Sequence, residues 1–275
     1  MRNWLFEKTA ILLFFCFFPL FCNAQSGYNI AIEMKNCNDT IAYLTFYQMD
    51  KTYIKDTCHK IKNGKIIFKG KEKLENGIYS LVNQNKSIAF DFFVDENTQN
   101  LKLKVDSTNF RREATAENAV QENDFFEYIK FLTAQNEKFI NTKNQIKGLS
   151  KTDSIAKLTE MQKELELSIQ EYESQAAEKN KGSYLGDFLN LKREKILKDI
   201  PKASNGRPDS LKVYQYYKTH YWDGVDFKDA VITRNPFFST KLKKYFDTVI
   251  YKNPDSVIVE VDRIMRKPDQ GSLLY

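Results

Sequence analysis

The sequence is poor in the residues from which most catalytic sites are built. It has only two histidines, His59 and His220, and neither belongs to a His-Glu-x-x-His pattern. It has four cysteines and no Cys-x-x-Cys. The common zinc-hydrolase and dithiol redox signatures are therefore absent, and no Ser-His-Asp set can be singled out. We expect no catalytic residue, no metal site and no cofactor in this chain, and hence no enzymatic activity.

A dense block of positive charge is also missing. The 42 lysines and arginines and the 36 aspartates and glutamates are spread along the chain, and the formal net charge is +6. A nucleic-acid partner is not expected, because such a partner needs basic residues gathered along a phosphate backbone. The lysines between residues 55 and 73 are interpreted as outward-facing charges that shield edge strands from mispairing.

The N-terminus has the pattern of a cleavable signal peptide. Basic residues precede an apolar run at residues 10–18, and the small residues of Cys22-Asn23-Ala24 suit signal peptidase. We expect cleavage after Ala24, export to the periplasm or cell envelope of a bacterium, and no stable membrane insertion afterwards. The alternatives are a retained anchor, for which the run is short, and a lipoprotein at Cys22, where residues 19–21 do not fit a lipobox.

Residues 25–108 have the pattern of a β domain. Residues 28–34 alternate between apolar and polar, and about seven short segments of this kind are separated by turns. Asn63-Gly64 predicts a tight hairpin between residues 56–62 and 65–68, since both residues tolerate positive φ. An antiparallel sandwich or barrel is expected.

The rest of the chain is predicted to be helical, which makes the fold class α+β. Residues 109–180 carry apolar residues at helical spacing on two long segments, 118–146 and one beginning at Asp153, which predicts an antiparallel helical hairpin. Residues 181–275 form a further helical domain, with one helix expected over Ser183–Leu197. Asn-Pro pairs at residues 235–236 and 253–254 are typical of an N-cap followed by proline.

Two cysteines remain once the signal peptide is removed. Cys37 and Cys58 enclose a loop of about twenty residues, and a disulfide there would stabilise the fold by roughly 3 kcal/mol. Such a bond would be a structural staple, because redox-active thiols usually lie close together at a helix N-terminus. The alternative is a pair of separate buried thiols.

One aromatic-rich stretch is a candidate ligand pocket. Tyr217, His220, Tyr221 and Trp222 lie within six residues of each other, and such side chains line many small-molecule sites. The alternative is ordinary aromatic packing. His59 is expected on the surface. Asp223, Asp226 and Asp229 do not fit a calcium loop and are expected to cap helices or to lie in a solvated turn.

Two segments resemble known domain families. Gly64–Gly70, followed by Gly77–Val82 and preceded by Tyr53–Thr57, is similar to the β domain DUF4369. The stretch Tyr221–Asp229, with Asn235-Pro236-Phe237-Phe238 and residues 254–258, resembles the helical domain DUF5106. In that family these domains precede a thioredoxin-like domain of the TlpA/AhpC-TSA type, in periplasmic thiol-disulfide oxidoreductases. No thioredoxin signature is present here, so the resemblance transfers no catalytic residue.

The resemblance implies a non-catalytic accessory or interaction module of such an oxidoreductase. It would bind a protein partner or self-associate through the helical hairpin. The alternative function is a cell-envelope protein that binds a small ligand or glycan. Because Leu273, Leu274 and Tyr275 would begin a new helix after the turn at Pro268 and Gly271, we expect the helical domain to be incomplete at its C-terminus. The alternative is a natural end whose apolar tip docks on the helical domain.

Overall fold

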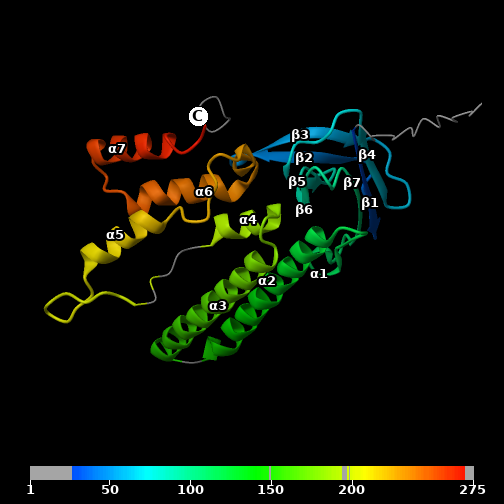
Figure 1. Cartoon of the computed structure of the whole chain (residues 1–275). Helices are drawn as coiled ribbons and strands as arrows, with labels where there is room; N and C mark the ends of the chain where they lie inside the picture. The colour runs from blue at the N-terminus through cyan, green and yellow to red at the C-terminus, as the bar shows by residue number, and fades with distance from the viewer. Residues whose placement is uncertain (1–26, 149, 194–196, 198, 270–275) are drawn as a thin grey trace, which may run out of the picture.

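Two four-stranded sheets stacked as a sandwich form the N-terminal part of the chain (Figure 1). The structure is a computed structural model that describes residues 27–148, 150–193, 197 and 199–269. The predicted signal peptide and the residues Leu273, Leu274 and Tyr275 lie outside this part. The strands of the sandwich are β1 (Tyr28–Lys35), β2 (Ala42–Gln48), β3 (Lys51–Cys58), β4 (Lys65–Gly70), β5 (Gly77–Val82), β6 (Ile88–Val94), β7 (Asn100–Asp106) and the short β8 (Thr115–Ala116).

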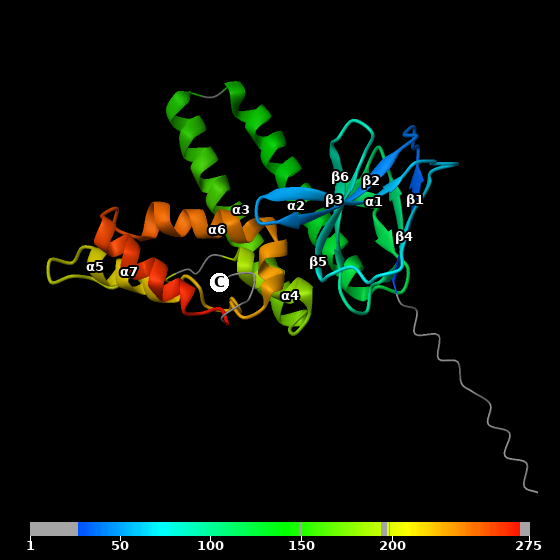
Figure 2. The same ribbon diagram turned by 90° about the horizontal axis from the view of Figure 1, so that it is seen from above.

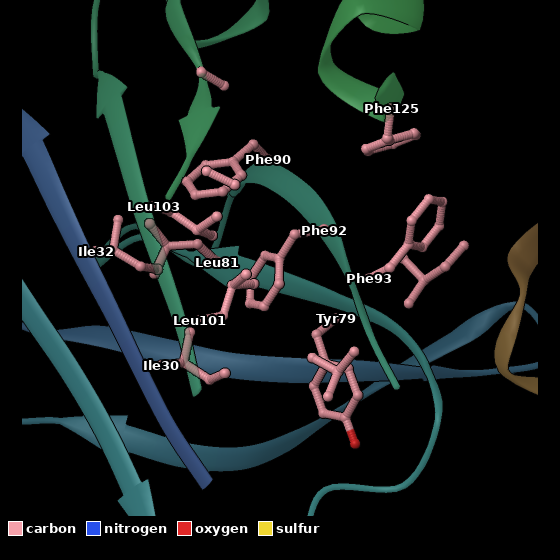
Figure 3. Close-up of a cluster of buried hydrophobic side chains, with 14 of the residues drawn as sticks. Ile30, Ile32, Tyr79, Leu81, Phe90, Phe92, Phe93, Leu101, Leu103 and Phe125 are labelled. Carbon is pink, nitrogen blue, oxygen red and sulfur yellow. The ribbon is translucent and has the colours of Figure 1, made fainter. Parts of the chain in front are cut away.

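The strand orders are β4-β1-β7-β8 and β3-β2-β5-β6, and only the β1–β7 pair among them is parallel. Apolar residues alternate along β1, where Ile30 and Ile32 point into the sandwich and are almost fully buried. Figure 3 shows them in one cluster with Leu101 of the neighbouring strand β7 and Phe92 of β6 in the facing sheet. The predicted sandwich is therefore confirmed, and a closed barrel is not formed.

The Asn63-Gly64 turn has the expected backbone but joins different strands from those predicted. Asn63 and Gly64 have φ of +52° and +70°, and Lys62 pairs with Lys65 through a single bridge. Beyond that bridge β3 pairs with β2, and β4 pairs with β1 in the other sheet. The predicted hairpin is wrong because the chain crosses between the two sheets here. A hairpin does join β2 to β3, at a turn in which Met49 has φ of +57°.

Helices make up the remainder of the described chain. They are α1 (Phe110–Glu113), α2 (Val120–Gln145), α3 (Lys151–Lys179), α4 (Tyr184–Lys192), α5 (Ser210–His220), α6 (Pro236–Lys244) and α7 (Pro254–Met265), with 3-10 turns η1 (Ile146–Gly148) and η2 (Ala230–Arg234) and a π-helical turn η3 (Tyr245–Val249). The long α2 and α3 lie side by side as the predicted hairpin (Figures 1 and 2).

The predicted helix caps are correct, but one predicted helix is too long. The side chains of Asn235 and Asn253 accept hydrogen bonds from the backbone N–H groups of Phe237 and Ser256, as N-caps do. The helix expected over Ser183–Leu197 ends at Lys192, and Arg193 has an extended backbone. The carbonyl of Arg193 accepts a bond of 2.9 Å from the Lys241 ammonium group, which satisfies a group that a longer helix would have bonded internally.

One hydrophobic core joins the sandwich to the base of the helical hairpin. It includes Phe93 of β6, Phe125 of α2 and Phe188 of α4, whose ring centroids lie 4.5 to 5.9 Å apart. The sequence-based boundary at residue 108 therefore divides two segments that share a core. A second, smaller core includes residues of α4, α6 and α7 and contains Trp222 and Tyr245.

The tip of the β2–β3 hairpin reaches the C-terminal helices (Figure 1). The Met49 N–H donates to the Thr233 carbonyl at 2.6 Å. The Arg234 guanidinium lies 4.8 Å from the Phe46 ring and pairs with Glu75. Sandwich and second core are thus in direct contact. Among the described residues, none of the helices has the length and apolar character needed to cross a bilayer.

Candidate functional site

Helix α5 presents a stripe of tyrosines that the fold does not bury. The helix begins at the N-cap Asp209, whose side chain accepts a bond from the Lys212 N–H. Spacings of three and four residues place Val213, Tyr214 and Tyr217 on one face, which Tyr221 extends just past the helix end. None of the α5 residues is buried. A helix with an apolar stripe and no buried side chain has a free packing face.

This face forms one wall of a cavity of about 560 Å³. We call it the α5 groove and define it by the residues that line it. They are Gln170 of α3, Ile200, Pro208, Ser210, Val213, Tyr214, Tyr217, Tyr221, Lys244, Thr248 and Val249. The volume is within the range of small-molecule sites, and the mixture of apolar walls with a few polar groups is typical of them.

The electrostatics of the α5 groove are simple. Among the described residues that line it, Lys244 is the charged one. Two hydroxyl groups are held by the protein itself: Tyr221 Oη donates to the Lys241 carbonyl at 2.9 Å, and Thr248 Oγ1 donates to the Lys244 carbonyl at 2.7 Å. The groove is therefore suited to a ligand that is mainly apolar.

The structure brings together two of the four residues predicted as a ligand pocket. Tyr217 and Tyr221 line the α5 groove. Trp222 points away from it into the second core, where 5% of its surface is exposed and its ring packs 5.2 Å from both Phe227 and Tyr245. Its Nε1 has no hydrogen-bond partner among the described residues. Trp222 therefore packs among aromatic side chains, which was the alternative to a place in a ligand pocket.

His220 also lies outside the groove. Its Nδ1 is 2.7 Å from Asp223 Oδ2 on the surface, and its ring is 4.6 Å from that of Tyr216. Asp226 and Asp229 accept bonds from the backbone N–H groups two residues later, and Asp229 caps η2. The predicted capping and turn roles of these aspartates are confirmed. His59 is exposed, as expected.

The two cysteines are free thiols in the structure. Cys58 is buried at the end of β3, and Cys37 is half-buried beside Gly64. The disulfide staple stays a prediction. Of the lysines between residues 55 and 73, three lie on the outermost strands β3 and β4, where they shield sheet edges: Lys55, Lys65 and Lys69. The described residues include no group of three or more His, Cys, Asp or Glu side chains arranged to hold a metal.

Two buried ionisable groups were not predicted from the sequence. Glu122 of α2 is fully buried, and its Oε2 accepts a bond of 3.0 Å from the Phe93 N–H. Burial raises the pKa of Glu122 to about 8, against the lowering effect of that bond. The spacing of Glu122 from Phe125, Phe126 and Ile129 places it on the apolar face of α2, which is the signal that could have revealed it.

The second group is Glu173 of α3, which binds two partners across the base of the hairpin. Its Oε1 accepts bonds of 2.5 Å from Tyr128 Oη and from the Lys192 ammonium group. Burial together with the Glu173 carboxylate raises the pKa of Tyr128. These three residues fix α2, α3 and α4 to one another, and their side chains satisfy each other without an added ligand.

Family comparisons match both parts of the chain. Residues 28–125 match the family described as Domain of unknown function (DUF4369), and residues 160–275 match the one described as Domain of unknown function (DUF5106). The chain combines these two domains. The DUF4369 match extends from β1 into α2 as far as Phe125, and the DUF5106 match includes every residue that lines the α5 groove. No curated protein and no solved structure matches the chain.

Proposed function

We propose that this chain is a non-catalytic interaction module of an exported thiol-disulfide oxidoreductase of the thioredoxin class. It acts in the periplasm or cell envelope by binding, through the helical hairpin, a second copy of itself or a partner protein. The observation that supports this proposal is the uneven burial along the hairpin. The described residues between 129 and 172 include a single buried side chain, that of Ile146.

This half of the hairpin is an arm that projects away from both cores (Figure 2). Ile140 on α2 and Ile155 and Leu167 on α3 are about half exposed. Helices of this length gain most of their stability in proteins from packing an apolar face. An arm whose apolar side chains stay in water is suited to packing against another protein.

Two experiments test this function. In an insulin-reduction assay the purified chain should give no turnover above the uncatalysed rate, and clear turnover would refute the non-catalytic part. Light scattering after gel filtration should give a dimer that Ile140→Glu converts to a monomer. Ala134→Glu, which adds the same charge at an exposed position on a different face of α2, is the control. If the wild-type chain is a monomer, self-association is refuted, and the proposal then requires a separate partner protein.

A second candidate function is supported by the α5 groove alone. In this case the chain is a cell-envelope protein that binds a small ligand or glycan at Tyr214, Tyr217 and Tyr221. The groove shares Gln170 with the arm, but the test positions Ile140 and Tyr217 lie on different helices, so the two functions can be tested independently. Saturable binding of a ligand that is lost in Tyr217→Ala would support the second candidate.

A further inference from the structure

A second cavity lies between strand β6 and the two helices that contact it, α1 and α2 (Figure 1). Its volume is about 380 Å³, and we call it the β6 cavity. Apart from Tyr47, Asp91 and Arg111, the described residues of its lining are apolar. The sequence neighbours of every lining residue also belong to the described part of the chain, and no described residue lines both this cavity and the α5 groove.

Asp91 supplies the carboxyl group among the described lining residues. It lies on the same face of β6 as Phe93, whose ring packs against Phe125 of α2 (Figure 3). Its Oδ1 accepts hydrogen bonds from Ser80 Oγ at 2.5 Å and from Tyr47 Oη at 3.4 Å. Its Oδ2 accepts no hydrogen bond from a described residue. Because each carboxylate oxygen can accept two bonds, Asp91 keeps an acceptor for a ligand.

Asp91 also lacks a cation among the described residues. Burial raises its pKa, against the lowering effect of the bonds from Ser80 and Tyr47. A carboxylate that is withdrawn from water without a cation is destabilised in its charged form. A ligand cation beside Asp91 would offset that cost, since the two charges then attract each other away from bulk water.

Arg111 is the other charged residue of the described lining, and it lies at the surface. Its side chain is exposed, and its guanidinium carbon is 5.7 Å from the centre of the Phe110 ring. It forms no ion pair with Asp91. The charge of an exposed arginine acts through water and is screened by salt, so Arg111 opposes a cation at Asp91 only weakly.

The walls of the β6 cavity are aromatic. Phe125 and Phe126 of α2 are buried with ring centroids 6.0 Å apart, and Phe110 of α1 is half-buried. Ile88 of β6 is 46% exposed, so a ligand would remove apolar surface from water. Phenyl rings pack well against another ring, and their faces attract cations.

We propose that the β6 cavity binds a free small-molecule amine, with its ammonium group at Asp91 and an apolar, aromatic-sized body against Phe110, Phe125 and Phe126. The carboxylate and the aromatic walls together specify this ligand class, because one recognises the charge and the other the body. The inference rests on neither of the functions proposed above.

The test is a titration of the wild-type chain with three probes of similar size, followed by ligand-observed NMR. They are 2-phenylethylammonium, the neutral 2-phenylethanol and the anionic 3-phenylpropionate. We expect saturable binding of the ammonium probe, roughly tenfold tighter than that of the alcohol, because a bond between charged groups is stronger than one to a neutral donor. The anion should bind least.

Variants of the chain locate the site. Asp91→Asn keeps an acceptor for Ser80 but removes the charge, and it should weaken binding of the ammonium probe about tenfold or more. Glu127→Gln is the matched control, since it removes a negative charge at an exposed position of α2 outside the lining, and it should bind as the wild type does. Phe110→Ala should also weaken binding. Circular dichroism establishes that each variant is folded.

Four results would overturn the proposal. They are equal binding of the ammonium and alcohol probes, no binding of any probe, unchanged affinity in a folded Asp91→Asn variant, and preferred binding of the anion that is lost in Arg111→Gln. A fourth probe, N-acetyl-lysine amide, represents a lysine side chain of a partner protein. If it binds more tightly than 2-phenylethylammonium, the free amine is refuted as the ligand. The comparison of probes uses the wild-type chain and therefore decides the matter even if Asp91→Asn does not fold.

Discussion

The ring of Phe93 at the end of β6 lies 4.5 Å from the ring of Phe125 on α2. This contact joins the sandwich to the hairpin within one core (Figure 3). Because both rings are buried, we expect the two parts to unfold together.

Phe125→Ala should therefore destabilise the whole unit by about 3–5 kcal/mol, since it leaves a cavity in a shared core. Urea unfolding followed by circular dichroism, with Phe139→Ala in the half-buried part of the arm as control, measures the difference. Separate transitions for strands and helices in the wild type would contradict the shared core.

Glu122 should make stability depend on pH. Its pKa is raised to about 8 in the folded chain by burial, against an ordinary value near 4.5 when unfolded. Between these two values the folded state binds more protons, so stability falls as the pH rises from about 5 to 8. Glu122→Gln should remove this fall, leaving stability at pH 5 nearly unchanged and raising it at pH 9 by on the order of 5 kcal/mol.

The urea midpoints of the two proteins at pH 5, 7 and 9 provide the measurement. Glu127→Gln, at an exposed position of the same helix, controls for the general loss of a negative charge. Parallel pH profiles for wild type and Glu122→Gln would contradict the assignment.

Lys192→Met should destabilise the base of the hairpin by about 2–4 kcal/mol, because it leaves the buried Glu173 carboxylate without its cation. Adding Glu173→Gln should recover part of the loss. Lys179→Met, which removes a largely exposed partner of Asp124, should cost less than about 1 kcal/mol. Thermal melts of the four proteins distinguish these outcomes, and equal losses for the two lysines would refute the role of the buried pair.

Gly64→Ala should cost about 2–4 kcal/mol. Gly64 has φ of +70°, and an added Cβ would lie 2.0 Å from the Met34 carbonyl oxygen, a backbone atom that cannot move aside cheaply. Gly206 has a similar φ of +76° but no atom within 4 Å of such a Cβ. Gly206→Ala should therefore cost only about 1 kcal/mol. Chemical unfolding of both variants separates the cost of positive φ, which both share, from the cost of the steric clash with the Met34 carbonyl, which only Gly64→Ala creates.

The sandwich, the helical hairpin and the Asn-Pro caps were predictable because each depends on local periodicity or on residues a few positions apart. The partner of β4 was not, because Asn63 and Gly64 specify a turn but not the sheet that the chain enters after it. The β2–β3 turn at Met49 was missed because it contains neither glycine nor proline.

For the candidate site, the sequence identified Tyr217 and Tyr221 but grouped them with His220 and Trp222. Neighbours in a helical stretch point in different directions, about 100° apart. Tyr221 consequently faces the groove while Trp222 enters the core. Gln170, Lys244 and Val249 line the groove because distant segments of the chain pack together. No local sequence pattern predicts such packing.

The bond between Met49 and Thr233 has a mechanical consequence. The C-terminal helices contact the rest of the chain at α4, through α6, and at strands β2 and β5, through η2, and these places are far apart in sequence. Contacts at separate places restrict how the C-terminal helices can turn relative to the sandwich, because a rotation about one of them would break another.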